Sequence, residues 1–186
     1  GATWTDRGTG GAITGAFGDF CYGNSLFVAV GGVGGNALIA TSANGTSGWT
    51  TRTPASGTLG LTAVCWNGTV FVACGDNGEI QTSPDGIAWT KRRDAAYPNQ
   101  LITGVQSDNN GNLLATTRDS SESGHVIYSI DNGVTWKELN GIDSTGASGT
   151  SNIMYGLGFG HGKFVAVGRD TDSTVGQTWA SMRQPK

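Results

Sequence analysis

The sequence is poor in charged residues and has no long apolar run. Charged residues make up 13% of the 186 residues, and the net charge is −3. Binding to phosphate backbones needs clustered lysine and arginine, so this balance argues against a nucleic-acid partner. No run of about 18 apolar residues occurs, which predicts no membrane insertion. The chain opens at Gly1 without a charged and then apolar leader, so we expect that any targeting segment either was removed or never existed.

Cysteine and histidine are also scarce. The cysteines Cys21, Cys65 and Cys74 form no Cys-x-x-Cys pair and are odd in number, which argues against a zinc site and a disulfide framework. They are predicted to be buried free thiols. The two histidines, His125 and His161, lie far apart and are interpreted as loop or turn residues. The sequence therefore predicts no metal and no cofactor.

Glycine, in contrast, is abundant, with 32 residues, and apolar segments recur along the chain. A Phe-Val-Ala motif ending in glycine appears at 27–31, 71–75 and 164–168. In the copy at 71–75, Asn-Gly and Asp-Gly pairs separate the apolar segments, and such pairs tolerate the positive φ of tight hairpin turns. A tryptophan recurs at intervals of 45, 40 and 47 residues, at Trp4, Trp49, Trp89 and Trp136.

This period matches one four-stranded propeller blade. In the second copy, for example, strands are predicted at 61–66, 70–74, 79–83 and 87–92. The fold class is therefore all-β: a small β-propeller of about four blades, each of four antiparallel strands. The chain is one domain over residues 1–186, with blades at approximately 10–53, 59–93, 101–139 and 153–182, the last completed by 2–7.

The fourth copy ends before any outer strand with its tryptophan. Residues 1–7, around Trp4, resemble the outer strands at 48–52 and 87–92. The N-terminal strand is therefore predicted to close the last blade, which leaves no open edge between first and last blades. A monomeric ring is favoured because closing one chain on itself costs only loop entropy. The alternative is an oligomer in which two chains pair to give eight blades.

One element of the repeat carries a family resemblance. The stretches 83–89 and 129–136 both contain serine, aspartate, glycine and a final tryptophan, and a weaker copy spans 42–49. This element resembles the Asp-box of sialidase-type (BNR) propellers, in which the motif is a structural hairpin. Structural roles are accordingly predicted for Ser83, Asp85, Gly86, Trp89, Ser129, Asp131, Gly133, Trp136, Trp49 and Trp4.

The same resemblance raises the alternative of a glycan-active hydrolase of sialidase-like type. Such enzymes use an arginine cluster, a tyrosine nucleophile with a glutamate, and an aspartate, as the resemblance implies. Here Arg7, Arg52 and Arg92 each follow a repeat tryptophan by three residues, which favours a scaffold role. Neither Glu79 nor Glu138 has an evident tyrosine partner. The sequence therefore predicts no catalytic residue and no enzyme activity.

Binding is the function that the sequence favours. Propellers gather their loops at the mouths of a rigid ring, and the loops that break the repeat are candidates for recognition. They are polar, with isolated aromatic and arginine residues that suit sugar hydroxyls and ring faces. The predicted binding residues are Arg93, Tyr97, Arg118, Asp119, Arg169 and Asp170.

The composition and repeats are also similar in style to propeller domains of bacteriophage tail fibres and other virion-surface proteins. This similarity implies a non-catalytic module that binds a host surface glycan or decorates the particle, in contact with another virion protein. The expected location is extracellular or on a virion surface. An assembly scaffold is the remaining alternative, which a large exposed aromatic patch would favour.

Overall fold

The computed structural model describes residues 3, 13–55, 59–92, 100–120, 124–139, 152–170 and 176–183. These residues form four antiparallel sheets, in each of which the strands follow one another in chain order. The predicted all-β propeller with four blades is confirmed. The predicted outer strand at 2–7, with Trp4, lies outside the described residues.

The strand bounds are as follows. The first sheet comprises β1 (Ala16–Gly23), β2 (Leu26–Val33), β3 (Asn36–Ser42) and β4 (Thr50–Arg52). The second comprises β5 (Leu61–Trp66), β6 (Phe71–Gly75), β7 (Ile80–Ser83) and β8 (Thr90–Lys91), with the 3-10 turn η1 (Asp76–Gly78) between β6 and β7. The third comprises β9 (Leu101–Ser107), β10 (Leu113–Arg118), β11 (Gly124–Ser129) and β12 (Lys137–Glu138). The fourth comprises β13 (Asn152–Gly160), β14 (Lys163–Asp170) and β15 (Gly176–Arg183).

Tight turns join the strands because the local sequence tolerates left-handed backbone. Asn77 and His161, for example, have φ of 53° and 50°, in the turns after β6 and β13. The outer strands are shorter than predicted: β8 covers two residues, whereas 87–92 was expected. The serine–aspartate turn before it uses its side chains to hold backbone N–H groups as far as Ala88, which shortens the segment free to pair with β7.

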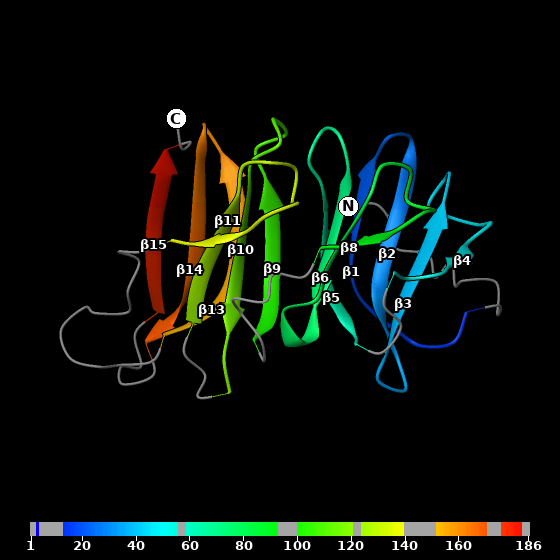
Figure 1. The fold of residues 1–186 in the computed structure, drawn as a ribbon, viewed down its shortest axis with the longest axis horizontal. Helices are drawn as coiled ribbons and strands as arrows, with labels where there is room; N and C mark the ends of the chain where they lie inside the picture. Colours follow the sequence, from blue (N-terminus) through cyan, green and yellow to red (C-terminus); the bar gives the residue numbers. More distant parts are fainter. Residues whose placement is uncertain are drawn as a thin grey trace.

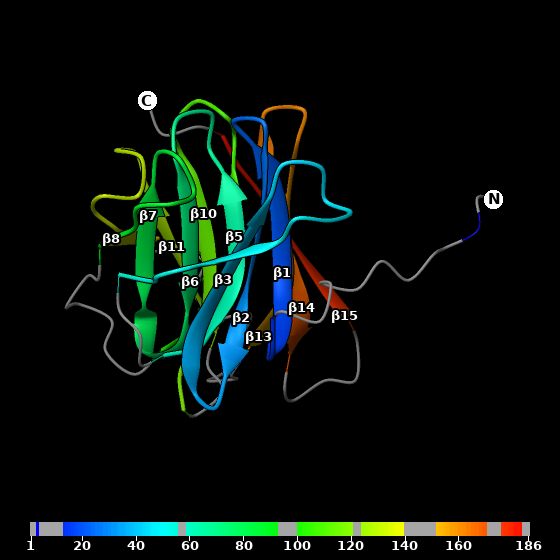
Figure 2. The same cartoon turned by 90° about the vertical axis from the view of Figure 1, so that its right-hand side faces the viewer.

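The four sheets lie in a row along the longest axis of the molecule, with β4 near one end and β15 at the other (Figure 1). Seen from the end of the row, the first sheet lies in front and the fourth behind (Figure 2). Each first strand packs on the first strand of the next sheet: β1 on β5, β5 on β9, and β9 on β13. No comparable packing joins β13 to β1 within the described part of the chain.

Three apolar clusters fill the three spaces between neighbouring sheets. The cluster between the first two sheets includes Val28, Val30 and Phe71, which are all fully buried. A second cluster, around Val72 and Trp136, joins the second and third sheets, and a third joins the third and fourth. The core is therefore divided into layers between blades, as the face-to-face packing of twisted sheets requires. No helix long and apolar enough to cross a membrane occurs among the described residues.

Candidate binding groove

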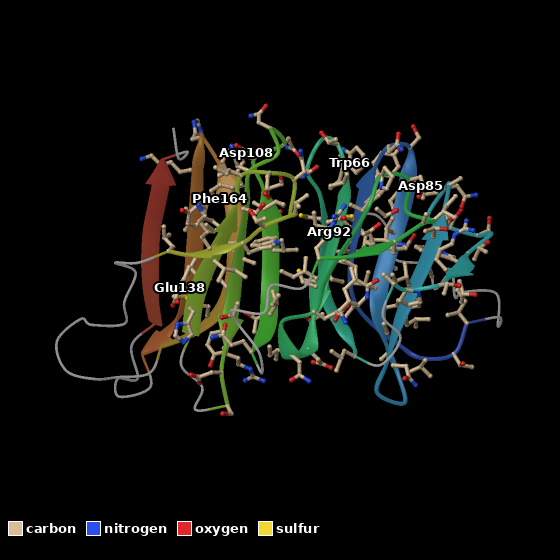
Figure 3. The ribbon with its side chains drawn as sticks, viewed as in Figure 1. Trp66, Asp85, Arg92, Asp108, Glu138 and Phe164 are labelled. Carbon is tan, nitrogen blue, oxygen red and sulfur yellow. The ribbon has the colours of Figure 1, made fainter. Side chains whose placement is uncertain are left out.

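The first strands of all four sheets line one hollow of ≈ 590 Å³. Its wall is made by 18–22 of β1, 62–66 of β5, 103–107 of β9, and residues of β13 from Tyr155 to Phe159. We call it the binding groove. It extends to the end of the sheets where the β9–β10 turn lies, since Asn109 also lines it. Figure 3 shows Trp66 and Asp108 at this end and Glu138 toward the other.

Every strand of the groove contains a β-bulge at the same point of the repeat. The register of each strand against its neighbour shifts by one residue there. The extra residues are Gly18, Thr62, Thr103 and Tyr155. Bulges bend a strand and redirect a side chain, and they recur at functional rims of sheet proteins. In the fourth sheet the redirected residue is a tyrosine with 61% of its surface exposed.

Hydrogen bonds between neighbouring bulges hold the groove rigid. The carboxylate Oδ2 of Asp19 accepts the N–H of Val64 at 2.9 Å. The hydroxyl of Thr62 donates to the carbonyl of Ile102, and the hydroxyl of Thr103 donates to the carbonyl of Met154 at 3.4 Å. Each first strand is thus tied to the next by a side chain at or beside its bulge, so the groove is preorganised before any ligand arrives.

Aromatic rings occupy one repeat position along the groove. Tyr22, Trp66 and Phe159 each pack at a tilt against the phenylalanine opposite in the next strand, with ring centroids 4.6, 4.6 and 4.8 Å apart. In the third sheet the position is Ser107, beside the amide of Gln106. The groove therefore offers apolar ring faces next to hydroxyl and amide groups, a combination that binds ligands with both apolar and polar surfaces.

Acidic chemistry in the groove is limited to one residue. Asp19 is the single carboxylate among the described residues that line it, and both of its oxygens accept backbone N–H groups. No group of three or more His, Cys, Asp or Glu that could hold a metal occurs in the described ranges. Burial, helped by the neighbouring Asp19, raises the pKa of the Cys21 thiol to about 12. The arrangement is suited to binding.

The serine–aspartate turns lie outside the groove, between the third and fourth strands. Asp85 Oδ1 accepts the N–H groups of Ile87 and Ala88 at 2.8 and 2.9 Å, and Ser83 Oγ accepts the N–H of Gly86 at 2.8 Å. Trp89 donates its indole N–H to the carbonyl of Gly86. The third sheet repeats these contacts through Ser129, Asp131, Gly133 and Trp136.

The first sheet carries a variant of the same turn. Asn44 takes the place of the aspartate and accepts the N–H groups of Thr46 and Ser47, each at 2.9 Å. Gly45 has a φ of 68°, which matches the 72° of Gly86. Trp49, at the end of this turn, lines a separate apolar hollow on the outer face of the first sheet.

Of the loop residues predicted to bind, Arg118 and Asp119 do not line the groove. Arg118 and Asp119 line a smaller hollow of ≈ 430 Å³ with Asp76 and Leu101, where β9 begins and β10 ends. Arg169 and Asp170 end β14, at the same repeat position as Arg118 and Asp119. Arg93 and Tyr97 lie outside the described residues. The structure thus separates Arg118 and Asp119 from the groove by the length of a strand.

Three polar pairs involve two remaining arginines and one histidine named in the sequence. Arg52 and Arg92 donate through Nε to Thr41 and Thr82, at 2.8 and 3.1 Å, so both brace an outer strand. His125 was expected in a loop, and this prediction is wrong: it lies in β11, with Nδ1 2.8 Å from Glu138 Oε1. The antiparallel pairing of β11 with β12 brings the two together, and no short sequence motif marks such a pair.

The groove residues were not predicted. Tyr22, Trp66 and Tyr155 are separated in sequence, and a repeat position was the only signal that linked them. Tyr22 and Trp66 each lie six residues before a strand valine, Val28 and Val72, whereas Tyr155 lies ten residues before Val165. No single residue type marks the bulge position in the sequence, since glycine, threonine and tyrosine all occupy it.

Comparisons with known proteins agree with this architecture. A family model described as DUF6242 beta propeller domain matches residues 2–185. Among solved structures, the computationally designed Ika4 protein has a TM-score of 0.58 at 14% identity, covering 91% of this chain and 94% of that one. YCF48 from Cyanidioschyzon merolae has a TM-score of 0.63 at 16% identity, covering 87% and 51%. YCF48 bound to D1 peptide has a TM-score of 0.59 at 18% identity, covering 90% and 56%.

These likenesses are below 25% identity and concern the fold alone. This chain spans about half the length of the two YCF48 chains. No curated protein matches it in sequence.

Proposed function

The chain belongs to the DUF6242 beta propeller domain family, and we propose that it is a non-catalytic recognition module that binds a glycan in the binding groove. The observation that carries this proposal is the pairing of exposed aromatic rings with hydroxyl and amide groups on preorganised strands. Tyr22 and Tyr155 expose 58% and 61% of their surfaces. A sugar ring has an apolar face for such rings and hydroxyl groups for the polar side chains.

The acid–base content of the groove supports a non-catalytic role. Hydrolysis of a glycosidic bond generally uses two carboxyl groups that flank it. Within the described lining, Asp19 is the only carboxylate, and it is engaged with the N–H groups of Phe20 and Val64. The proposal therefore assigns binding without bond cleavage. A place on a virion surface or tail fibre, with the glycan on a host cell, is the setting that the composition favours.

A peptide ligand is the second candidate. The first strands β1, β5, β9 and β13 each pair with one neighbour only, so each is an edge of its sheet. Edge strands can offer backbone N–H and C=O groups to an extended peptide. The structure of YCF48 bound to D1 peptide gives this alternative a precedent on the same fold.

Array binding of the purified chain tests the proposal. We expect selective binding to a subset of glycans, with no released product detected by chromatography. Tyr155→Ala should weaken this binding about tenfold, equivalent to about 1.4 kcal/mol. Arg118→Ala, at the far end of the sheets, is the matched control and should leave it unchanged.

Other results would move the site or the ligand. Loss of binding in Arg118→Ala, with Tyr155→Ala unaffected, would place recognition at the loops that contain Arg93, Tyr97, Asp119, Arg169 and Asp170. Binding to a peptide array without binding to glycans would select the second candidate. Product release would contradict the non-catalytic assignment.

A further inference from the structure

The three spaces between neighbouring sheets are built from the same repeat positions. On one face, the second strand of a sheet presents a valine or leucine to the sheet that follows. Val28, Val72 and Leu114 occupy this position in the first three sheets and are 0%, 0% and 3% exposed. Two residues later, Val30 and Cys74 are also fully buried. We call this side of a sheet its forward face.

The fourth sheet has the same forward face, and no described sheet packs on it. By strand register, Val165 and Val167 of β14 correspond to Val28 and Val30 of β2. Each is 40% exposed. The sequence thus places valines there as in a buried layer, and the described residues leave them open to solvent.

In the first sheet it is the opposite face, which we call the backward face, that no described sheet covers. On its backward face lies an apolar hollow of ≈ 430 Å³, lined mainly by Phe20, Phe27, Ala29, Gly45 and Trp49. Phe20 is 67% exposed, whereas its counterpart in the second sheet, Val64, is 4% exposed. The other four correspond by register and turn position to Phe71, Ala73, Gly86 and Trp89 of the second sheet.

The second sheet shows what this kind of hollow receives. There, the counterpart residues pack with Leu26, Val28 and Val30 from the forward face of the first sheet. A Cβ placed on Gly86 would lie 3.2 Å from a methyl carbon of Val28 and 2.8 Å from one of Leu26. The hollow on the first sheet is therefore a blade interface that lacks its forward face.

We propose that a second copy of this chain supplies the missing faces. Val165 and Val167 of each copy fill the apolar hollow of the other, which joins the two chains head to tail twice. Each copy has one uncovered forward face and one uncovered backward face. In a pair, the forward face of each copy covers the backward face of the other, so no apolar face is left open. The result is a ring of eight sheets, within the range of about 4 to 8 blades seen in propellers. Three copies would give twelve.

The arrangement of the sheets favours a second copy over closure within one chain. The first and fourth sheets lie toward opposite ends of the long axis (Figure 1). Bringing them together would require the angle at each of the three filled interfaces to change. Those interfaces contain close-packed residues such as Phe71, Val72 and Ala115, all 0% exposed, and close packing resists such rotation.

The native mass of the chain in solution tests this proposal. We expect light scattering to give twice the chain mass of 19.1 kDa. Phe20→Asp and Val165→Asp each place a charge at the proposed contact, one on each face, and each variant should have the mass of one chain. Val134→Asp is the matched control, since Val134 is 45% exposed but lies in the turn of the third sheet. Circular dichroism establishes that each variant is folded.

Mixing the two variants tests the head-to-tail pairing itself. In a mixed pair, both substitutions fall at one interface and the other interface is wild type. An equimolar mixture of Phe20→Asp and Val165→Asp should therefore regain pairs of mixed composition by native mass spectrometry. A wild-type mass of one chain would overturn the proposal, and so would a pair that persists in both variants. Failure of the mixture to form mixed pairs would overturn the head-to-tail arrangement. Glycan binding by Val165→Asp, which lies outside the groove, is a separate readout, so failure of either proposal can be recognised alone.

Discussion

The inner and outer sheets of this chain place the same residue types in different surroundings. In the second sheet, Val64 and Val72 are 4% and 0% exposed. Their counterparts at the ends of the row, Phe20 in the first sheet and Val165 in the fourth, are 67% and 40% exposed. A repeat sequence thus specifies two apolar faces per blade, and burial depends on whether a neighbour is present. Matched substitutions in an inner sheet and an end sheet test this dependence on a neighbour.

The largest effect is expected at the forward-face valine. Val72→Asp puts an unpaired charge into a close-packed layer and should destabilise the fold by about 3–5 kcal/mol, a large part of the stability of an ordinary domain. Val165→Asp, at the same repeat position, should dissociate the proposed pair but retain a cooperative transition in the single chain, because Val165 is 40% exposed there and exposed substitutions usually change the stability of a chain by less than about 0.5 kcal/mol. Urea unfolding followed by tryptophan fluorescence measures both. Equal destabilisation would mean that Val165 is buried in the monomer.

A smaller effect is expected at the serine–aspartate turns. Asp85→Ala removes two charge-assisted hydrogen bonds at an exposed site, and we expect a loss of about 1 kcal/mol in the free energy of unfolding. Asp85→Asn should cost less, because Asn44 makes the same contacts in the first sheet. The difference between the two variants isolates the hydrogen bonds from the charge.

The same residue predicts a pH dependence. Hydrogen bonds from the N–H groups of Ala88 and Ile87 hold the pKa of Asp85 below its usual value. A depressed folded-state pKa contributes stability above the unfolded pKa, and that contribution is lost as the pH falls through the folded pKa. The unfolding free energy of Asp85→Asn should therefore fall less steeply in acid than that of the wild type. An unchanged acid profile would contradict this cause.

The smallest expected difference between an end sheet and an inner sheet is in the rate at which their cysteine thiols react. Cys21 of the first sheet is half-buried, whereas Cys74 of the second is fully buried. Burial raises the pKa of both, so little thiolate exists at neutral pH. With a disulfide reagent, Cys21 should react slowly in the folded chain and Cys74 only after unfolding. Mass mapping of the labelled peptides measures this, and early labelling of Cys74 would indicate an open second layer.

Much of the architecture could be predicted from the sequence. The Phe-Val-Ala segments and the Asn-Gly and Asp-Gly pairs mark strands and turns by local chemistry, and the predicted strand 61–66 coincides with β5. The tryptophan period predicted the blades because each blade repeats one supersecondary unit. These features depend on residues close in sequence, which is why pattern alone finds them.

The groove and the open faces could not be predicted in that way. The groove exists because four bulges coincide across four sheets, and Thr62 and Thr103 carry no local mark of that role. Predicted binding residues were chosen for loop polarity, yet Arg118 lies at the far end of the sheets from Trp66 and Asn109. Whether Val165 has a neighbour depends on the curvature of the whole row, a property of tertiary packing that no single repeat encodes.

Methyl NMR with a soluble paramagnetic agent tests most directly whether a second copy covers the end faces of the row of sheets. The signals of Val28 and Val30 lie in a filled interface and should be protected from the agent. If the end faces are blade interfaces filled by a second copy, Val165 and Val167 will be protected to the same degree in the wild type. They will lose that protection in Phe20→Asp. Strong attenuation of the Val165 and Val167 signals in the wild type, at concentrations of the agent where Val28 is protected, would contradict the pairing of two copies.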